Sequence, residues 1–386
     1  MSEPPLLYLI AGEPSGDILG ARLMAALKEE TGGAIRFAGV GGERMAAEGL
    51  TSLVPIGELA VMGFAEVLPH APRLLRRIKE TVADIRARRP AAVVTIDSSG
   101  FTWRVARRLR AAGDRVRLIH YVAPMVWAWR AGRAKEIARW CDQLLVLLPF
   151  EPPYFEKVGL PATFVGHPVI EGGADRGDGP GFRARFGIDP RAPLVAILPG
   201  SRRGEARHLL PLFGAAARLL AAGHPGLRIV VPTLGTVAAM VRAAAASWPG
   251  APVILENDDD KFDAFAAADV ALAASGTVAL ELAMAHLPAI IAYRVNGLTA
   301  AIVRRMVKVR YVNLVNLLLD RAAVPEFIHY DCTPARLAAA VARLLAHADE
   351  RAAQIAAYDE ALALLGRGTL APSRRAARQV LAMMNG

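Results

Sequence analysis

The sequence predicts an α/β protein made of two Rossmann-like domains, each built around a parallel β-sheet. Three observations lead to this fold class. The chain has 386 residues, more than one hydrophobic core usually organises. Short β-branched or leucine-rich runs alternate with helical stretches, as they do in doubly wound sheets. The alternation stops at Glu171–Gly181, a segment rich in glycine and aspartate, and then begins again.

The first domain is expected to span residues 1–170. Its strands are separated by helical stretches, so right-handed crossovers should join them into one parallel sheet. We expect these strands at Leu6–Ala11, Ile35–Val40, Ala92–Ile96, Val116–Val122, Leu144–Leu148 and Thr163–Val165.

The segment Glu171–Gly181 lacks apolar periodicity, which predicts a linker or an exposed loop before a second domain at 182–345. Three helical stretches follow Pro334, and residues 346–386 are expected to pack back on the first domain or on a partner subunit, which leaves a homodimer open. Strands of the second domain are expected at Leu194–Leu198, Ile229–Val231, Val253–Leu255, Val270–Ala273 and Ala289–Ala292.

Two such domains, with parallel sheets facing a central cleft, form the GT-B architecture. Ligands of open α/β sheets bind beyond the carboxyl ends of the strands, so the cleft is the expected site. Glycosyltransferases, epimerases and some binding proteins share this arrangement, and the fold by itself does not choose among them.

Composition narrows the classes of function. The longest apolar stretch, Val270–Tyr293, is interrupted by Glu281 and His286, so no membrane-spanning helix is expected. The N-terminus lacks the basic region of a signal peptide, and the two cysteines are far apart, which together favour the cytoplasm. A net charge of +10 favours an anionic partner, either nucleic acid, a lipid surface or a phosphorylated substrate.

The stretch after the expected strand Val270–Ala273 is typical of a nucleotide site. Ser275, Gly276 and Thr277 form a small-residue turn into a helix, where backbone N–H groups can bind a diphosphate. Glu281 lies about one turn further on and could reach the ribose hydroxyls. The alternative is an ordinary helix cap formed by Ser275 or Thr277.

A second turn of this type follows the strand Leu194–Leu198 and ends in Gly200, Ser201 and Arg202. Arg202 could clamp a phosphate with two parallel hydrogen bonds, which lysine would do less well. The alternative is a solvated surface arginine.

In the first domain the strand Leu6–Ala11 ends in a turn with two carboxylates. Glu13, Ser15, Gly16 and Asp17 are candidate substrate contacts, although Asp17 could simply stabilise the first turn of a helix. The nearby Gly39–Gly42 resembles a dinucleotide fingerprint, but Arg44 replaces its third glycine, and we expect no nicotinamide site.

Asp97 directly follows the strand Ala92–Ile96, where a partly buried carboxylate is well placed to act as a general base. Its alternative role is to cap the next helix. His120 and His167 also lie near strand ends, and for both we favour a structural histidine.

A metal site is suggested only by Asp258–Asp260, which contains the D-x-D spacing of another class of glycosyltransferase. The run immediately precedes an expected helix, Phe262–Ala268, whose first turn acidic residues stabilise. We therefore expect no metal and no cofactor.

Two stretches combine apolar and basic residues, as membrane-surface segments do. The first contains Val61, Met62, Phe64 and Leu68, followed by a basic stripe at 73–79, and the second is Ala301–Tyr311. The alternative for each is an ordinary helix with one apolar face.

Together these residues resemble the lipid-A-disaccharide synthase family of Gram-negative bacteria, glycosyltransferase family 19, over essentially the whole chain. The motifs that carry the resemblance are Gly12–Asp17, Val126–Arg130, Phe164–Pro168, Leu198–Arg202, Ala274–Thr277, Asn316–Leu318 and Val324–Phe327.

The resemblance implies an inverting transferase of lipid A and lipopolysaccharide biosynthesis, with UDP-2,3-diacylglucosamine as donor and 2,3-diacylglucosamine 1-phosphate as acceptor. Its product is a β(1→6) disaccharide. Asp97, Arg202 and Asn316 match positions implicated in activity, and Glu326 lies in a matching motif. The acceptor and the membrane are assigned to the first domain and the UDP-sugar to the second. The enzyme is expected to be peripheral on the inner face of the inner membrane.

The chain departs from the family pattern in three places. Ser98–Gly100 follow Asp97 where the family often has a proline and a second acid, Val315 replaces a usual proline, and His329 stands where glutamine is common. Two other classes stay open: a UDP-sugar 2-epimerase of the same fold, and a nucleic-acid-binding module. The latter would explain the charge, yet no recognised nucleic-acid-binding motif occurs.

Overall fold

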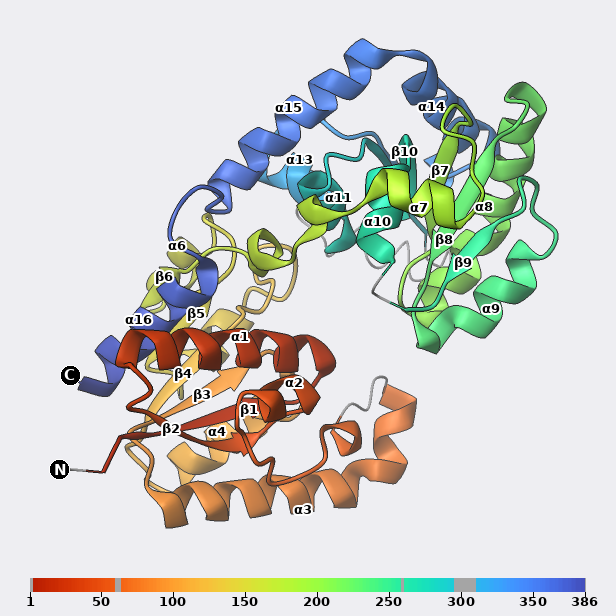
Figure 1. The fold of residues 1–386 in the computed structure, drawn as a ribbon. Helices are drawn as coiled ribbons and strands as arrows, with labels where there is room; N and C mark the ends of the chain where they lie inside the picture. Colours follow the sequence, from red (N-terminus) through yellow and green to blue (C-terminus); the bar gives the residue numbers. More distant parts are fainter. Residues whose placement is uncertain (1–2, 60–63, 258–259, 295–309, 386) are drawn as a thin grey trace. The chain divides into compact units, whose positions relative to one another are not determined.

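The computed structural model describes residues 3–59, 64–257, 260–294 and 310–385, with the backbone alone for 64–71. The chain divides into two compact units (Figure 1). The first comprises residues 1–168 and 368–386, and the second comprises residues 169–367. Two parallel six-stranded sheets with flanking helices confirm the predicted α/β class.

The sheet of the first unit has the strand order β2-β1-β3-β4-β5-β6, and every pair is parallel. All five residues of β3 are buried, because helices cover both faces of a doubly wound sheet. The six strands are β1 (Leu6–Ala11), β2 (Arg36–Val40), β3 (Ala92–Ile96), β4 (Arg117–Tyr121), β5 (Gln143–Val146) and β6 (Ala162–Phe164).

The last helix of the first unit comes from the far end of the chain. That helix, α16 (Pro372–Asn385), packs beside α1 (Pro14–Thr31) (Figure 1). Arg374 and Arg378 both bind the carboxylate of Glu30. The remaining helices are α2 (Glu43–Ala47), η1 (Ile56–Glu58), α3 (Phe64–Arg88), α4 (Thr102–Ala111), α5 (Arg133–Ile137), α6 (Pro152–Glu156) and η2 (Pro168–Glu171), which crosses the unit boundary.

The sheet of the second unit has the order β12-β11-β10-β7-β8-β9, again all parallel. Five of its strands match the prediction to within a residue or so. The sixth, β12, was not predicted, because a three-residue edge strand that begins with Glu326 has no apolar run. The strands are β7 (Leu194–Leu198), β8 (Arg228–Pro232), β9 (Val253–Leu255), β10 (Val270–Ala274), β11 (Ala289–Tyr293) and β12 (Glu326–Ile328).

The core of the second unit lies between this sheet and its helices, with α8 packed against α14 and α9. The three helical stretches expected after Pro334 are present as α14, α15 and α16. The helices of this unit are η3 (Ala174–Arg176), α7 (Gly179–Arg185), α8 (Arg203–Gly223), α9 (Gly235–Ala245), α10 (Lys261–Ala267), α11 (Val278–Met284), α13 (Leu314–Leu319), η4 (His329–Asp331), α14 (Pro334–Ala346) and α15 (Ala348–Leu364).

The expected linker Glu171–Gly181 is instead a packed part of the second unit. A Cβ atom at Gly177 would lie 2.1 Å from the carbonyl oxygen of Phe262, and one at Gly179 would lie 2.5 Å from that of Ala266. The glycines that suggest flexibility in the sequence therefore permit close contact with α10. The C-terminal stretch 346–386 also divides, because α15 packs on α11 and α13 in the second unit whereas α16 belongs to the first.

None of the helices within the described residues is long and apolar enough to cross a membrane.

Candidate active site in two half-sites

Each unit has a set of predicted site residues at the carboxyl edge of its own sheet. In the first unit, Gly12–Asp17 follow β1 and Asp97 follows β3, and these two strands are direct neighbours. In the second, Arg202 follows β7 and Ser275–Thr277 follow β10, which are also neighbours. The parallel register thus brings together turns that are far apart in sequence.

Two glycines let the turn after β1 approach β3 closely. A Cβ atom at Gly12 would lie 2.4 Å from Oγ of Ser98, directly after β3, and one at Gly16 would lie 3.5 Å from the carbonyl oxygen of Ile96. A side chain at Gly12 would therefore displace the residue next to Asp97. Ser15 is exposed in this turn, and Glu13 precedes the first helical residue of α1.

Asp17, a candidate substrate contact, has a structural role among the described residues. Its Oδ1 accepts hydrogen bonds from the backbone N–H groups of Gly42 at 2.7 Å and Met45 at 3.0 Å. Its Oδ2 accepts one from Arg44 at 3.0 Å. The buried carboxylate thus satisfies the first N–H groups of α2, which have no partners within that helix.

Asp97 is held in a strained turn. Asp97 and Ser98 both have positive φ, 46° and 45°, a conformation that residues other than glycine rarely adopt. The N–H of Asp97 donates to Tyr121 O at 2.9 Å, and Thr102 Oγ1 donates to Asp97 O at 2.6 Å. These bonds fix the backbone and leave the carboxylate to other partners. Strain of this kind is typical of functional sites.

The surroundings of Asp97 suit a general base. Burial raises the pKa of its carboxyl, while a hydrogen bond from the Ser98 backbone and the charge of Arg133 oppose that rise. A raised pKa makes the carboxylate a stronger proton acceptor near neutral pH. Sequence reasoning did not single out Arg133, because no motif relates α5 to β3 and only the fold brings their charges together.

His120 is a structural residue, as predicted. Its Nε2 accepts a hydrogen bond from Trp103 Nε1 at 3.2 Å, and its Nδ1 lies 2.8 Å from Thr95 Oγ1. Burial lowers its pKa to about 3, so the ring is neutral at physiological pH. His167 is also buried, which lowers its pKa to about 4.

In the second unit, the amides of the Gly200–Arg202 turn are already occupied. Gly200 has a φ of +98°, and a Cβ atom there would lie 2.3 Å from the Glu205 carboxylate. That carboxylate accepts hydrogen bonds from the backbone of Ser201 and Arg202, as a glutamate in the first turn of a helix can. An anion at this turn would therefore be bound by the exposed Arg202 side chain rather than by these amides.

The second turn combines buried and exposed atoms. Ser275 Oγ donates to Val312 O at 3.2 Å, so this side chain holds the neighbouring loop, while Gly276 and Thr277 are exposed. Lys261 Nζ lies 2.6 Å from Glu281 Oε2. The carboxylate of Glu281 would therefore have to bind the expected ribose in place of Lys261, or bind both at once.

Asn316 and Glu326 are both expected to bind substrate, and in the structure both side chains hydrogen-bond within the protein. Asn316, 1% exposed, uses its amide fully: Nδ2 donates to Val324 O and to Glu326 Oε1, both at 2.7 Å, and Oδ1 accepts from the N–H groups of Ala323 and Val324, both at 2.8 Å. Glu326 also accepts from the N–H groups of Val312 and Asn313.

Both side chains therefore position the loop that Ser275 contacts. The departure at Val315 belongs to the same loop. Its N–H donates to Asn313 Oδ1 at 2.9 Å, a bond that proline could not make.

Several predicted features fall outside the described residues. These are Val61 and Met62, the side chains of Phe64 and Leu68, Asp258 and Asp259, and most of Ala301–Tyr311. Asp260 is described, and its Oδ1 lies 2.6 Å from Arg185 NH2. Within the described part of the chain no group of three or more His, Cys, Asp or Glu side chains could hold a metal ion.

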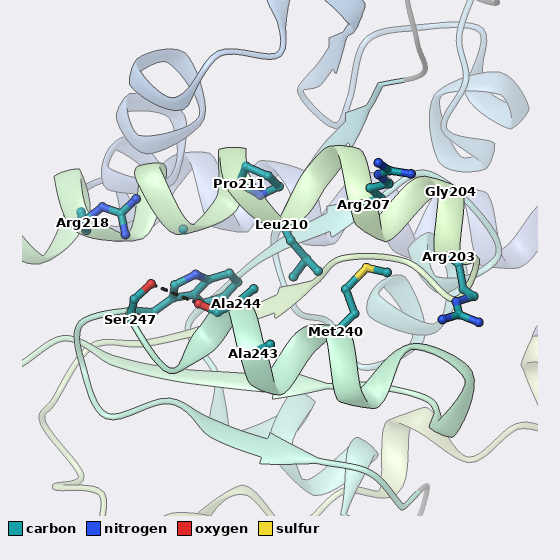
Figure 2. Close-up of a pocket in the computed structure, with 12 residues that line it drawn as sticks. Arg203, Gly204, Arg207, Leu210, Pro211, Arg218, Met240, Ala243, Ala244 and Ser247 are labelled. Atoms are coloured by element: carbon teal, nitrogen blue, oxygen red, sulfur yellow. Dashed lines mark hydrogen bonds between the residues drawn. The ribbon is translucent and has the colours of Figure 1, made fainter.

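A cavity of about 700 Å³ lies between α8 and α9 (Figure 2). Its apolar floor includes Leu210, Met240 and Trp248, and its rim carries Arg203, Arg207 and Arg218. It begins next to Arg202 but includes none of the predicted site residues. The candidate half-sites are therefore open strand-edge turns rather than this cavity.

Comparisons with known proteins give the functional context. Residues 7–380 match the family model described as lipid-A-disaccharide synthetase. A lipid-A-disaccharide synthase from Rhodospirillum centenum is 58% identical over 98% of this chain and 94% of its own length. One from Paramagnetospirillum magneticum is 55% identical over 97% of both.

Solved structures share the fold at low identity. A UDP-GlcNAc 2-epimerase from Neisseria meningitidis bound to UDP-GlcNAc has a TM-score of 0.66 at 10% identity, covering 98% of this chain and 99% of that one. MurG from Acinetobacter baumannii has a TM-score of 0.56 at 14% identity, covering 98% and 100%.

Proposed function

The chain belongs to the lipid-A-disaccharide synthase family, and on that premise we propose that it transfers 2,3-diacylglucosamine from UDP-2,3-diacylglucosamine to the 6-hydroxyl of 2,3-diacylglucosamine 1-phosphate. The observation that carries this proposal is the family match over residues 7–380, together with relatives up to 58% identical over nearly the whole chain. The products are the lipid A disaccharide 1-phosphate and UDP.

The mechanism that we propose is a single in-line displacement. Asp97 accepts the proton of the acceptor 6-hydroxyl as its oxygen forms a bond to the donor anomeric carbon. The bond from that carbon to the UDP oxygen breaks, UDP leaves with the electron pair, and the configuration inverts. The raised pKa of Asp97 and its fixed backbone support the role of base.

Arg202 is proposed to bind the diphosphate. It is exposed and forms no ion pair within the described residues, although Glu205 is near enough for the two charges to interact. Its interaction with UDP strengthens as negative charge develops on the leaving group, so it would stabilise the transition state more than the ground state. Gly276 offers an open backbone at the neighbouring turn.

Membrane docking is the second part of the proposal, because an acceptor with two acyl chains must be collected from a bilayer. Support comes from the described part of α3, where Arg73, Arg76 and Lys79 are exposed and Leu75 is 42% exposed. Apolar side chains beside basic ones suit an anionic lipid surface. We propose that this face and the preceding segment 61–68 dock on it.

The UDP-sugar 2-epimerase alternative shares the fold, and the likeness to solved epimerases concerns the fold alone. One experiment separates the two activities. The protein is incubated with UDP-2,3-diacylglucosamine, with and without 2,3-diacylglucosamine 1-phosphate, and the products are identified by mass spectrometry. We expect disaccharide and UDP only when both substrates are present. An epimerised UDP-sugar formed without acceptor would overturn the proposal.

A further inference from the structure

The segment after β4, Val122–Arg133, lies beside the base and carries unusual exposed side chains. β4 pairs directly with β3, and the N–H of Asp97 donates to Tyr121 O at 2.9 Å, so the segment begins next to the Asp97 turn. Met125 is 54% exposed and Trp129 is 36% exposed. Large apolar side chains at the carboxyl edge of a sheet are suited to contact a ligand.

Two arginines of this segment form no ion pair among the described residues. The guanidinium of Arg130 stacks 4.5 Å over the ring of Trp129, and that of Arg133 stacks 4.4 Å over the ring of Trp103. The pKa of Arg133 is lowered, mainly by burial. The positive charge of Arg130 lowers it further, so the two guanidinium groups are near enough to interact. The charge of Glu136 raises the pKa of Arg133, and Glu136 also accepts a hydrogen bond from Arg107 Nη1 at 3.2 Å.

Arg130 is exposed and Arg133 is partly buried, and two neighbouring positive charges without ion-pair partners favour an anion between them. Arg133 forms no ion pair with Asp97, yet the charges of the two residues influence each other. An anion at the arginines would thus lie near the base without touching it. The proposed acceptor fits this arrangement, because its phosphate on C1 and its reacting hydroxyl on C6 are separate groups of one sugar.

The segment is held by a buried carboxylate. Glu151, 3% exposed, accepts hydrogen bonds from Trp127 Nε1 at 3.1 Å and from the N–H groups of Leu147 and Leu148 at 3.2 Å and 3.0 Å. Trp127 also packs edge-on against Phe150, with ring centroids 5.4 Å apart. Val122 has a φ of +81°, a strained value for a β-branched residue, so the segment is not in its relaxed conformation.

We propose that this segment is the acceptor subsite. Arg130 and Arg133 bind the phosphate of the acceptor, and Trp129 packs on its sugar ring. Glu151 is a positioning residue that holds the segment through its hydrogen bond with Trp127. The proposal rests on the proposed function and adds the location of the acceptor to it. Arginine suits a phosphate that needs several fixed donors, and an aromatic ring suits the apolar face of a sugar.

The test compares two acceptors, 2,3-diacylglucosamine 1-phosphate and the same lipid without phosphate. We expect the wild type to prefer the phosphorylated acceptor in kcat/KM by about tenfold or more. Arg130→Gln should raise the KM for the phosphorylated acceptor by about tenfold, leave the donor KM unchanged and abolish the preference. Arg130→Lys should restore part of it. The control is Arg139→Gln, at an exposed arginine just beyond α5.

Glu151→Gln tests the positioning role. It should raise the acceptor KM while the donor KM and the affinity for UDP stay at wild-type values, and circular dichroism should show an intact fold. An Arg130→Gln variant that still discriminates between the two acceptors would overturn the subsite. A wild type that makes no disaccharide from either acceptor would instead overturn the proposed function.

Discussion

Gly12 and Ser98 are packed so closely that a Cβ atom at Gly12 would lie 2.4 Å from the Ser98 hydroxyl oxygen. Ser98 follows Asp97 in a turn where both residues have positive φ. The first glycine of the chain's first strand-to-helix turn therefore controls the position of the proposed base. This relationship motivates the first of five predictions.

Gly12→Ala should displace Ser98 and with it Asp97, because the Oγ and Cβ atoms of Ser98 leave no room for the added methyl group. We expect kcat to fall by about tenfold or more, since small misplacement of a catalytic group is costly. Steady-state kinetics and UDP titration check this. The control is Gly100→Ala, at which a Cβ atom would meet nothing within 4 Å. Equal kcat values for the two variants would contradict the prediction.

Asp97→Asn should remove the base and keep the fold, with a loss in kcat on the order of a hundredfold and with little change in UDP affinity. Because the pKa of Asp97 is raised, the base is lost as pH falls through a value above that of an ordinary aspartate. In the wild type, kcat should therefore begin to fall at a pH above the usual pKa of aspartate. The variant should show no such fall. Near-normal turnover by Asp97→Asn would exclude it as the base.

Arg202→Ala should weaken UDP binding by about tenfold and lower kcat, because a charge-assisted interaction contributes about 1.5–3 kcal/mol. Calorimetric titration with UDP measures the first effect, and single-turnover kinetics measure the second. Arg203→Ala, at the next exposed arginine, is the matched control. The phosphate role of Arg202 fails if both variants bind UDP equally well.

Asn316→Ala should lower stability first and activity only as a consequence. The substitution leaves four hydrogen-bonding groups without Asn316, two of them in buried bonds and two in partly buried ones, and unsatisfied buried polar groups cost about 1–3 kcal/mol each. We expect a loss of about 3 kcal/mol or more in the free energy of unfolding, measured by urea denaturation. A variant of wild-type stability that had lost only UDP affinity would instead support a direct substrate role for Asn316.

Replacing Met62 and Phe64 together by serine should weaken binding to anionic vesicles and turnover of the lipid acceptor, while UDP binding stays intact. Each apolar side chain removed lessens burial at the headgroup boundary, and the remaining basic charges are screened by salt. Vesicle sedimentation at low and high salt measures this. The control replaces Leu219 and Leu364, exposed leucines of α8 and α15, by serine. Identical sedimentation of the two double variants would place the docking face elsewhere.

Much of the fold could be predicted because it depends on local patterns. Buried strands of five or six residues, such as β1 and β3, are continuous apolar runs bounded by turn residues, and their alternation with helices specifies parallel sheets. The edge strand β12 could not be predicted, since its pairing with β11 and not its composition makes it a strand.

The sequence by itself determined the family, the two α/β units and the positions of the turns that carry Asp97, Arg202 and Ser275. Only the tertiary structure decided what the polar side chains do, because a hydrogen-bonding group is available to a ligand only where no other part of the chain satisfies it. Asp17 and Asn316 have their partners supplied by segments that the fold brings to them. Arg130 and Arg133 form no ion pair among the described residues. Whether a polar side chain has a partner depends on tertiary packing, which cannot be inferred from the spacing of residues along the chain.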